Sequence, residues 1–182
     1  MSSFDLSAFV KKPIVMIGGV IIILILLFMI FFGGGGGEDP TAKSVKNLSN
    51  QHQALVNLID GYSRSVKSAN LKSNISQVSI ILIANKNDLD TYFSGLSKES
   101  RKVKSTVSTK PKKDLITRLD QAKISNNLDS EIKSVVLSEL QLIENAIQKI
   151  KKENSNKASL SVLTDKLILN NQTIITRLNE SR

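Results

Sequence analysis

DPTAKSVKNLSNQHQALVNLIDGYSRSVKSA, residues 39–69, is the stretch that decides the fold of this chain. Apolar side chains recur in it at alternating spacings of three and four residues, which places them on one face of an α-helix. Asp39 is a good N-cap residue, and Pro40 suits the first helical position. The stretch therefore predicts an amphipathic helix whose apolar face other elements must cover. That face carries, in order, Val45, Leu48, His52, Leu55, Ile59, Tyr62, Val66 and Ala69.

The chain after residue 69 repeats this helical pattern. The segment 78–84, VSIILIA, could also be read as a strand, but the helical spacing around it favours a helix. Glycine and proline are scarce beyond residue 37, which argues against a turn-rich β domain. Residues 38–182 are therefore predicted to form an all-α, antiparallel bundle of four to five helices. The later helices are expected over residues 74–96, about 111–126, about 129–152, with Asp129 or Ser130 as its cap, and about 159–179.

The N-terminal region has three parts. Residues 1–12 are a short polar head, and residues 13–32, PIVMIGGVIIILILLFMIFF, contain no charge. A helix of that length spans about 30 Å, the thickness of the bilayer core, so this segment is predicted to be a transmembrane anchor. Residues 33–37 are five glycines and are expected to form a flexible linker. A cleaved signal peptide is the alternative, although its apolar core is usually shorter.

The charges beside residues 13–32 bear on orientation. Lys11 and Lys12 directly precede the segment, and lysine is retained on the cytoplasmic side of a membrane. We therefore expect a single-pass protein of the cell membrane, with the head 1–12 in the cytoplasm and the domain 38–182 outside it. Lys43 and Lys46, a little beyond the segment, count against this orientation.

Composition narrows the classes of partner. The chain has no cysteine, so disulfides and thiol chemistry are excluded. Without Lys11, Lys12 and Asp5, the 25 basic and 16 acidic residues become 23 and 15, a net charge of +8 for the domain. Such a field favours acidic partners: anionic lipid, a polyanion of the cell envelope, an acidic protein or nucleic acid.

Residues 97–113, SKESRKVKSTVSTKPKK, are predicted to be a loop or a frayed helix end, and they hold the candidate binding site. Clustered cations can bind anionic headgroups or polymers. Nucleic acid is a less suitable partner, because the few aromatic side chains of the domain belong to apolar stripes and offer no stacking surface. The alternative is a solvated loop that only keeps the domain soluble. The candidate residues are Lys98, Arg101, Lys102, Lys104, Lys110, Lys112 and Lys113.

The sequence does not contain the patterns that enzymes and metal proteins use. His52 is the only histidine, and its stripe position predicts half-buried packing or a polar interruption of the stripe. No Glu-x-x-His or His-x-x-x-His pair is present, and no glycine-rich phosphate loop. We therefore expect no catalytic residues, no metal, no cofactor and no small-molecule substrate.

One segment resembles a known family. Leu55-Val56-Asn57-Leu58-Ile59-Asp60-Gly61-Tyr62 is similar to the leucine- and asparagine-rich stretch ending in Gly-Tyr of the LemA family of bacterial membrane proteins. A short basic head, one N-terminal span and an outward helical bundle is also the layout of that family. The arginine-rich, tryptophan-containing pattern expected just before the stretch is missing, and the resemblance implies no catalytic residues.

The function expected from these features is binding or scaffolding at the cell envelope by a membrane-anchored, outward-facing, non-enzymatic helical protein. A structural subunit of a membrane assembly, such as a secretion, pilus or division complex, is the alternative. In that case the transmembrane helix would itself be an interface.

Overall fold

The computed structural model describes residues 39–180, whose regular secondary structure is helical. It contains no strand, so the prediction of an all-α fold is confirmed for these residues, and 78–84 is part of a helix. The helices are α2 (Pro40–Tyr62), α3 (Ala69–Ser94), α4 (Lys113–Ile124), α5 (Leu128–Glu153) and α6 (Ala158–Glu180), with 3-10 turns η2 (Ser63–Ser65) and η3 (Ser100–Lys102).

The predicted head 1–12, transmembrane segment 13–32 and linker 33–37 all lie outside the described residues. Among the helices of residues 39–180, none combines the length and the apolar character that crossing a bilayer requires.

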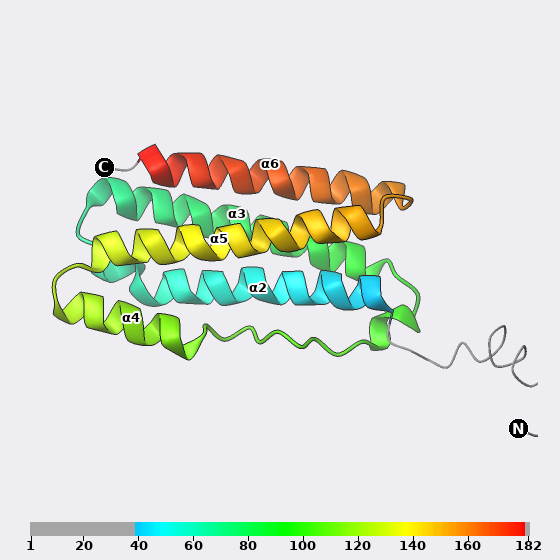
Figure 1. Ribbon diagram of the computed structural model, residues 1–182, viewed down its shortest axis with the longest axis horizontal. Helices are drawn as coiled ribbons and strands as arrows, with labels where there is room; N and C mark the ends of the chain where they lie inside the picture. The colour runs from blue at the N-terminus through cyan, green and yellow to red at the C-terminus, as the bar shows by residue number, and fades with distance from the viewer. Residues whose placement is uncertain (1–38, 181–182) are drawn as a thin grey trace, which may run out of the picture. The chain divides into compact units, whose positions relative to one another are not determined.

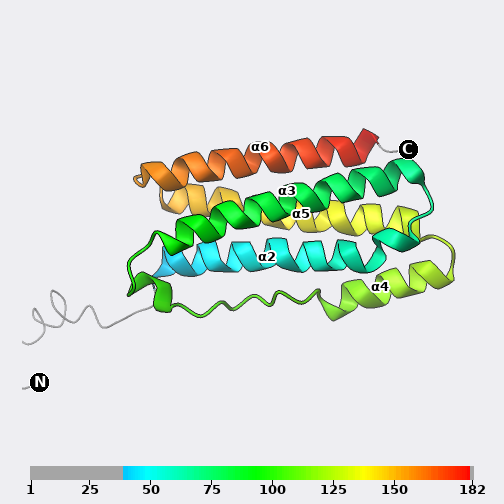
Figure 2. The same cartoon turned by 180° about the vertical axis from the view of Figure 1, so that it is seen from behind.

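Four of the helices form an antiparallel bundle (Figures 1 and 2). α2 packs against α3 and α5, and α6 packs against the same two helices, so α2 and α6 occupy opposite corners. Each helix runs antiparallel to its two neighbours, as Figure 1 shows. The shorter helix α4 lies outside this square, against α5.

The connection between α3 and α5 is the unusual part of the topology. These two helices run in the same direction, so the chain must return along the bundle between them (Figure 1). Residues 103–112, which we call the strap, make the first half of that return without regular secondary structure, and α4 makes the second half. The predicted loop or frayed helix end over 97–113 is thus an ordered crossover that begins with η3.

The predicted apolar stripes meet in one core. Fully burying a leucine or isoleucine side chain contributes roughly 1.5–3 kcal/mol. Glu38–Arg182 is a compact unit, and it contains this core by itself, so we expect a fragment of these residues to fold alone. The largest fully buried side chains are Leu48, Ile59, Ile75, Leu82, Leu89, Leu119, Ile132, Leu140, Ile147, Leu160, Leu167 and Ile174.

The start of α2 is the predicted one. Asp39 caps the helix, because its Oδ1 accepts the backbone N–H of Thr41 (2.9 Å) and of Ala42 (3.1 Å). Burial alone would raise the pKa of Asp39, but hydrogen bonds from Ser100 and from these two N–H groups hold it below its ordinary value. Pro40 is the first helical residue.

The end of α2 and the cap of α5 differ from the predictions. α2 ends at Tyr62, although its apolar stripe was expected to continue to Ala69. The carboxylate of Asp129 accepts the backbone N–H of Lys67 (2.9 Å) and of Ser68 (2.7 Å). These two hydrogen bonds fix the end of the α2–α3 connector, residues 63–68. Asp129 therefore does not cap its own helix, which begins one residue earlier, at Leu128.

Two other helix boundaries differ from the predicted ones, and local hydrogen bonds and backbone geometry explain the difference. α3 begins at Ala69, five residues before the predicted start, because the Ser68 hydroxyl accepts the N–H of Leu71. α4 ends at Ile124, because Asn126 adopts a left-handed φ of 62°. The N–H of Asn127 then reaches the carbonyl of Ala122 (2.8 Å), which closes a Schellman motif.

Candidate functional site

All seven predicted site cations are exposed, and they divide into two groups. Lys98, Arg101 and Lys102 lie in and beside η3, at the end of the bundle where α2 begins (Figure 1). Lys110, Lys112 and Lys113 lie at the start of α4, and Lys104 belongs to the strap between the groups. Lys110 follows Lys102 by eight positions, up to about 26 Å in an extended chain, and the strap between them runs along the bundle (Figure 1). The cluster in the sequence is therefore a row along the bundle.

Asparagines on one face of α2 hold the strap in place. Asn47 Oδ1 accepts the backbone N–H of Thr106 (2.9 Å), and its Nδ2 donates to the Thr106 hydroxyl (3.1 Å). Asn50 Nδ2 donates to the Ser105 hydroxyl and to the carbonyl of Val107, both at 2.8 Å. A chain segment without helical hydrogen bonds must satisfy its backbone groups elsewhere, and here the side chains of α2 do so.

Asn57 extends this ladder by two turns of the helix. Its Nδ2 donates to the carbonyl of Thr109 (2.8 Å), and its Oδ1 accepts from Gln53 Nε2 (2.9 Å). We call Asn47, Asn50 and Asn57 the asparagine ladder. Sequence reasoning missed it, although spacings of three and seven residues put all three on one helical face.

The second cationic group is fixed by α4. The Tyr62 hydroxyl donates to Asp120 Oδ1 (2.7 Å), and this contact ties α4 to the end of α2. Burial, together with the Asp120 carboxylate, raises the pKa of Tyr62 to about 12. Lys112 Nζ lies 2.8 Å from Glu139 Oε1 of α5, so one of the three cations in this group is paired.

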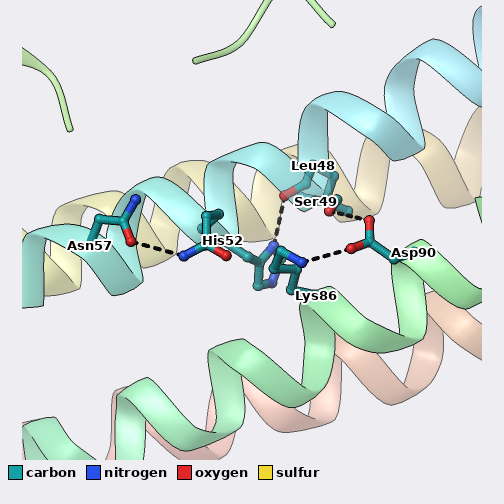
Figure 3. Close-up of polar contacts among 7 residues, drawn as sticks. Leu48, Ser49, His52, Asn57, Lys86 and Asp90 are labelled. Atoms are coloured by element: carbon teal, nitrogen blue, oxygen red, sulfur yellow. Dashed lines mark hydrogen bonds and ion pairs between the residues drawn. The ribbon is translucent and has the colours of Figure 1, made fainter. Parts of the chain in front are cut away.

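His52 is completely buried, although its position in the sequence predicted half-buried packing. Its Nδ1 lies 2.8 Å from the carbonyl of Leu48 and so carries the proton that this contact needs (Figure 3). Burial lowers the pKa of His52 to about 4, and the hydrogen bond to Leu48 opposes only part of that shift. The ring is a neutral core group without access to solvent, which does not suit a catalytic base or a ligand.

A polar chain beside His52 joins α2 to α3. The Ser49 hydroxyl donates to Asp90 Oδ1 (2.6 Å), and Lys86 Nζ donates to Asp90 Oδ2 (2.7 Å), as Figure 3 shows. Burial raises the pKa of Asp90, but the hydrogen bonds from Lys86 and Ser49 outweigh it and leave the pKa below its ordinary value. The Ser49–Asp90 hydrogen bond joins the two helices, and the Lys86–Asp90 pair lies within α3.

The described residues contain no candidate metal centre. Within residues 39–180, no group of three or more His, Cys, Asp or Glu side chains is placed to hold a metal ion. The candidate site is therefore a row of exposed cations, and side-chain hydrogen bonds from α2 fix the backbone between its two groups.

The chain matches no model of a known protein family, no curated protein and no solved structure. The resemblance of residues 55–62 to the LemA family therefore gains no support from these comparisons.

Removing the asparagine ladder should loosen the strap. We expect the double variant Asn47→Ala, Asn50→Ala to be cleaved by trypsin after Lys104 at least tenfold faster, since each lost hydrogen bond contributes on the order of 1 kcal/mol. The double variant Asn145→Ala, Asn179→Ala changes two exposed helical asparagines elsewhere and is the control. Equal cleavage rates for both would show that the ladder does not hold the strap.

Burial of His52 should make stability depend on pH. Its folded pKa, about 4, is below the unfolded value of 6.5. Above pH 6.5 both states are neutral; as pH falls from 6.5 toward 4, the unfolded chain takes up a proton first. Chemical denaturation of residues 38–182 should therefore show a loss of about 3 kcal/mol over this window that His52→Leu lacks. Carboxylates titrate in both proteins, so equal losses would contradict the burial of a neutral ring.

Proposed function

We propose that this chain is a membrane-anchored helical binding protein of the cell envelope. In this proposal residues 13–32 are a single-pass anchor and residues 33–37 a flexible linker. The bundle faces outward and acts by binding a partner, without catalysis. The linker gives the bundle reach, and the cationic row makes the contact.

The observation that carries this proposal is the fixed row of cations. Lys98, Arg101 and Lys102 at one end and Lys110 and Lys113 at the other are exposed, and the asparagine ladder orders the backbone between them. Ordering that is complete before binding lowers the entropic cost of association.

The spacing of the row favours one kind of partner. Two groups up to about 26 Å apart can both contact an extended polymer with repeated negative charges, whereas a compact anion meets only one group. Linked contacts of this kind raise the overall affinity. We therefore propose an anionic polymer of the cell envelope as the partner, in preference to anionic lipid or an acidic protein.

Orientation is the first part of the proposal to test. With a tag at the C-terminus, we expect protease to digest the tag in cells whose outer layers are opened but whose inner membrane is sealed, because Lys11 and Lys12 favour a cytoplasmic N-terminus. A cytoplasmic marker protein should stay intact in the same sample. Protection of the tag until the membrane is lysed would place the bundle in the cytoplasm and end the proposal.

Charge reversal tests the binding surface. The variant Lys98→Glu, Arg101→Glu, Lys102→Glu should bind polyphosphate, a defined polyanion, at least a hundredfold more weakly, because each cation near an anionic surface contributes roughly 1 kcal/mol and the new carboxylates add repulsion. Co-sedimentation of the full chain with isolated envelopes should fall in parallel.

The matched control reverses three exposed cations at the other end of the bundle, Arg64, Lys72 and Lys123. It carries the same net charge, so equal weakening by both variants would show that overall charge, not the row, causes binding. Exchange of residues 13–32 for an unrelated apolar helix should leave binding intact; a loss would indicate the subunit of a membrane assembly instead.

A further inference from the structure

A pocket of about 310 Å³ lies beneath the strap, between α2, α5 and the start of α4. Leu142 lines this pocket and is 48% exposed. At about 30 Å³ per water in the liquid, this volume equals roughly ten water-sized groups, enough for a short acyl chain or a small ring system. Its apolar walls include Ala54, Leu58, Val107, Leu115, Leu142 and Ile143.

One side of this pocket is basic. Lys110 and Lys112 line it, and Lys113 begins α4 directly beside them. Lys112, the N-cap residue of α4, makes no capping hydrogen bond with its side chain, and a helix N-terminus attracts negative charge. Asp114 in the same turn and Glu139, the partner of Lys112, offset two of the three cations, so one positive charge remains in excess.

We propose that this pocket binds a single-chain anionic amphiphile of about ten carbons. Its chain lies between Leu58 and Leu142, and its acidic head meets Lys110, Lys113 and the first turn of α4. The strap forms the roof of the site, through Val107. The pocket shares Lys110 and Lys113 with one group of the row, but its apolar walls and volume are independent of the envelope polymer, and the group near η3 lies outside it.

Photo-labelling of the full chain tests this site. The probe is decanoic acid that carries a photoreactive diazirine, used below its micelle concentration on chain embedded in zwitterionic lipid nanodiscs. We expect saturable labelling in peptides around residues 54–58, 107–115 and 139–143. Unlabelled decanoate should compete, and decanol and decyltrimethylammonium should compete at least tenfold less well, since a hydrogen bond to a charged group contributes about 1.5 kcal/mol or more.

Two variants separate the pocket from the charge. Ala54→Phe fills the pocket from a partly exposed position and should reduce labelling at least tenfold; Leu169→Phe adds the same ring to an exposed site on α6 and should not. Lys110→Ala with Lys113→Ala should weaken competition by decanoate about tenfold, and Lys98→Ala with Arg101→Ala should leave it unchanged.

The outcomes distinguish this inference from the proposed function. Ala54→Phe leaves the charge unaltered, so lost labelling with intact polyphosphate binding supports the pocket as a separate site. Labelling that is unsaturable, or that Ala54→Phe and Leu169→Phe affect equally, overturns the proposal. Equal competition by decanol overturns the acidic head group, and labelling of the bundle outside the three peptides overturns the location.

Discussion

The parallel course of α3 and α5 is the constraint from which the surface of this protein follows. Helices on opposite corners of the square that run in the same direction cannot be joined by a short turn, so the chain must travel back along the bundle. The strap and α4 are that return path. The row of cations lies on and beside this return path, and the pocket lies beneath it. A plain up-and-down bundle would have neither the strap nor α4.

A return path of this kind creates a problem of hydrogen bonding. Residues 103–112 have no helical ladder, and α2 supplies the partners through Asn47, Asn50 and Asn57. Side-chain amides suit this task because each offers both a donor and an acceptor. The lysine side chains of the strap are exposed, and the asparagine ladder fixes the backbone that carries them.

The interior contains polar groups that an apolar core does not require. His52, Asn85 and Asn171 are each at most 1% exposed, on α2, α3 and α6. Asn170 of α6 donates to Asn85 (2.6 Å), and Asn171 donates to the carbonyl of Leu140 on α5 (3.1 Å). A shift of one helix along another would break these bonds and bury unpaired amides, which costs about 1–3 kcal/mol each. Their effect is to fix one register among several that would bury similar apolar area.

The sequence by itself determined the all-α class, the antiparallel bundle, the Asp39 cap and most of the buried side chains, because these depend on local spacing and on the cost of leaving apolar stripes in water. It also identified the seven cations. It could not show that Asp129 closes the α2–α3 connector, that His52 is fully buried, or that the asparagine ladder turns residues 103–112 into an ordered strap. Those features depend on residues about 30 to 60 positions apart that meet only when helices pack, and spacing along one helix carries no information about its neighbour. The two groups of cations and the pocket under the strap were decided in the same way, by the direction of α5 relative to α3.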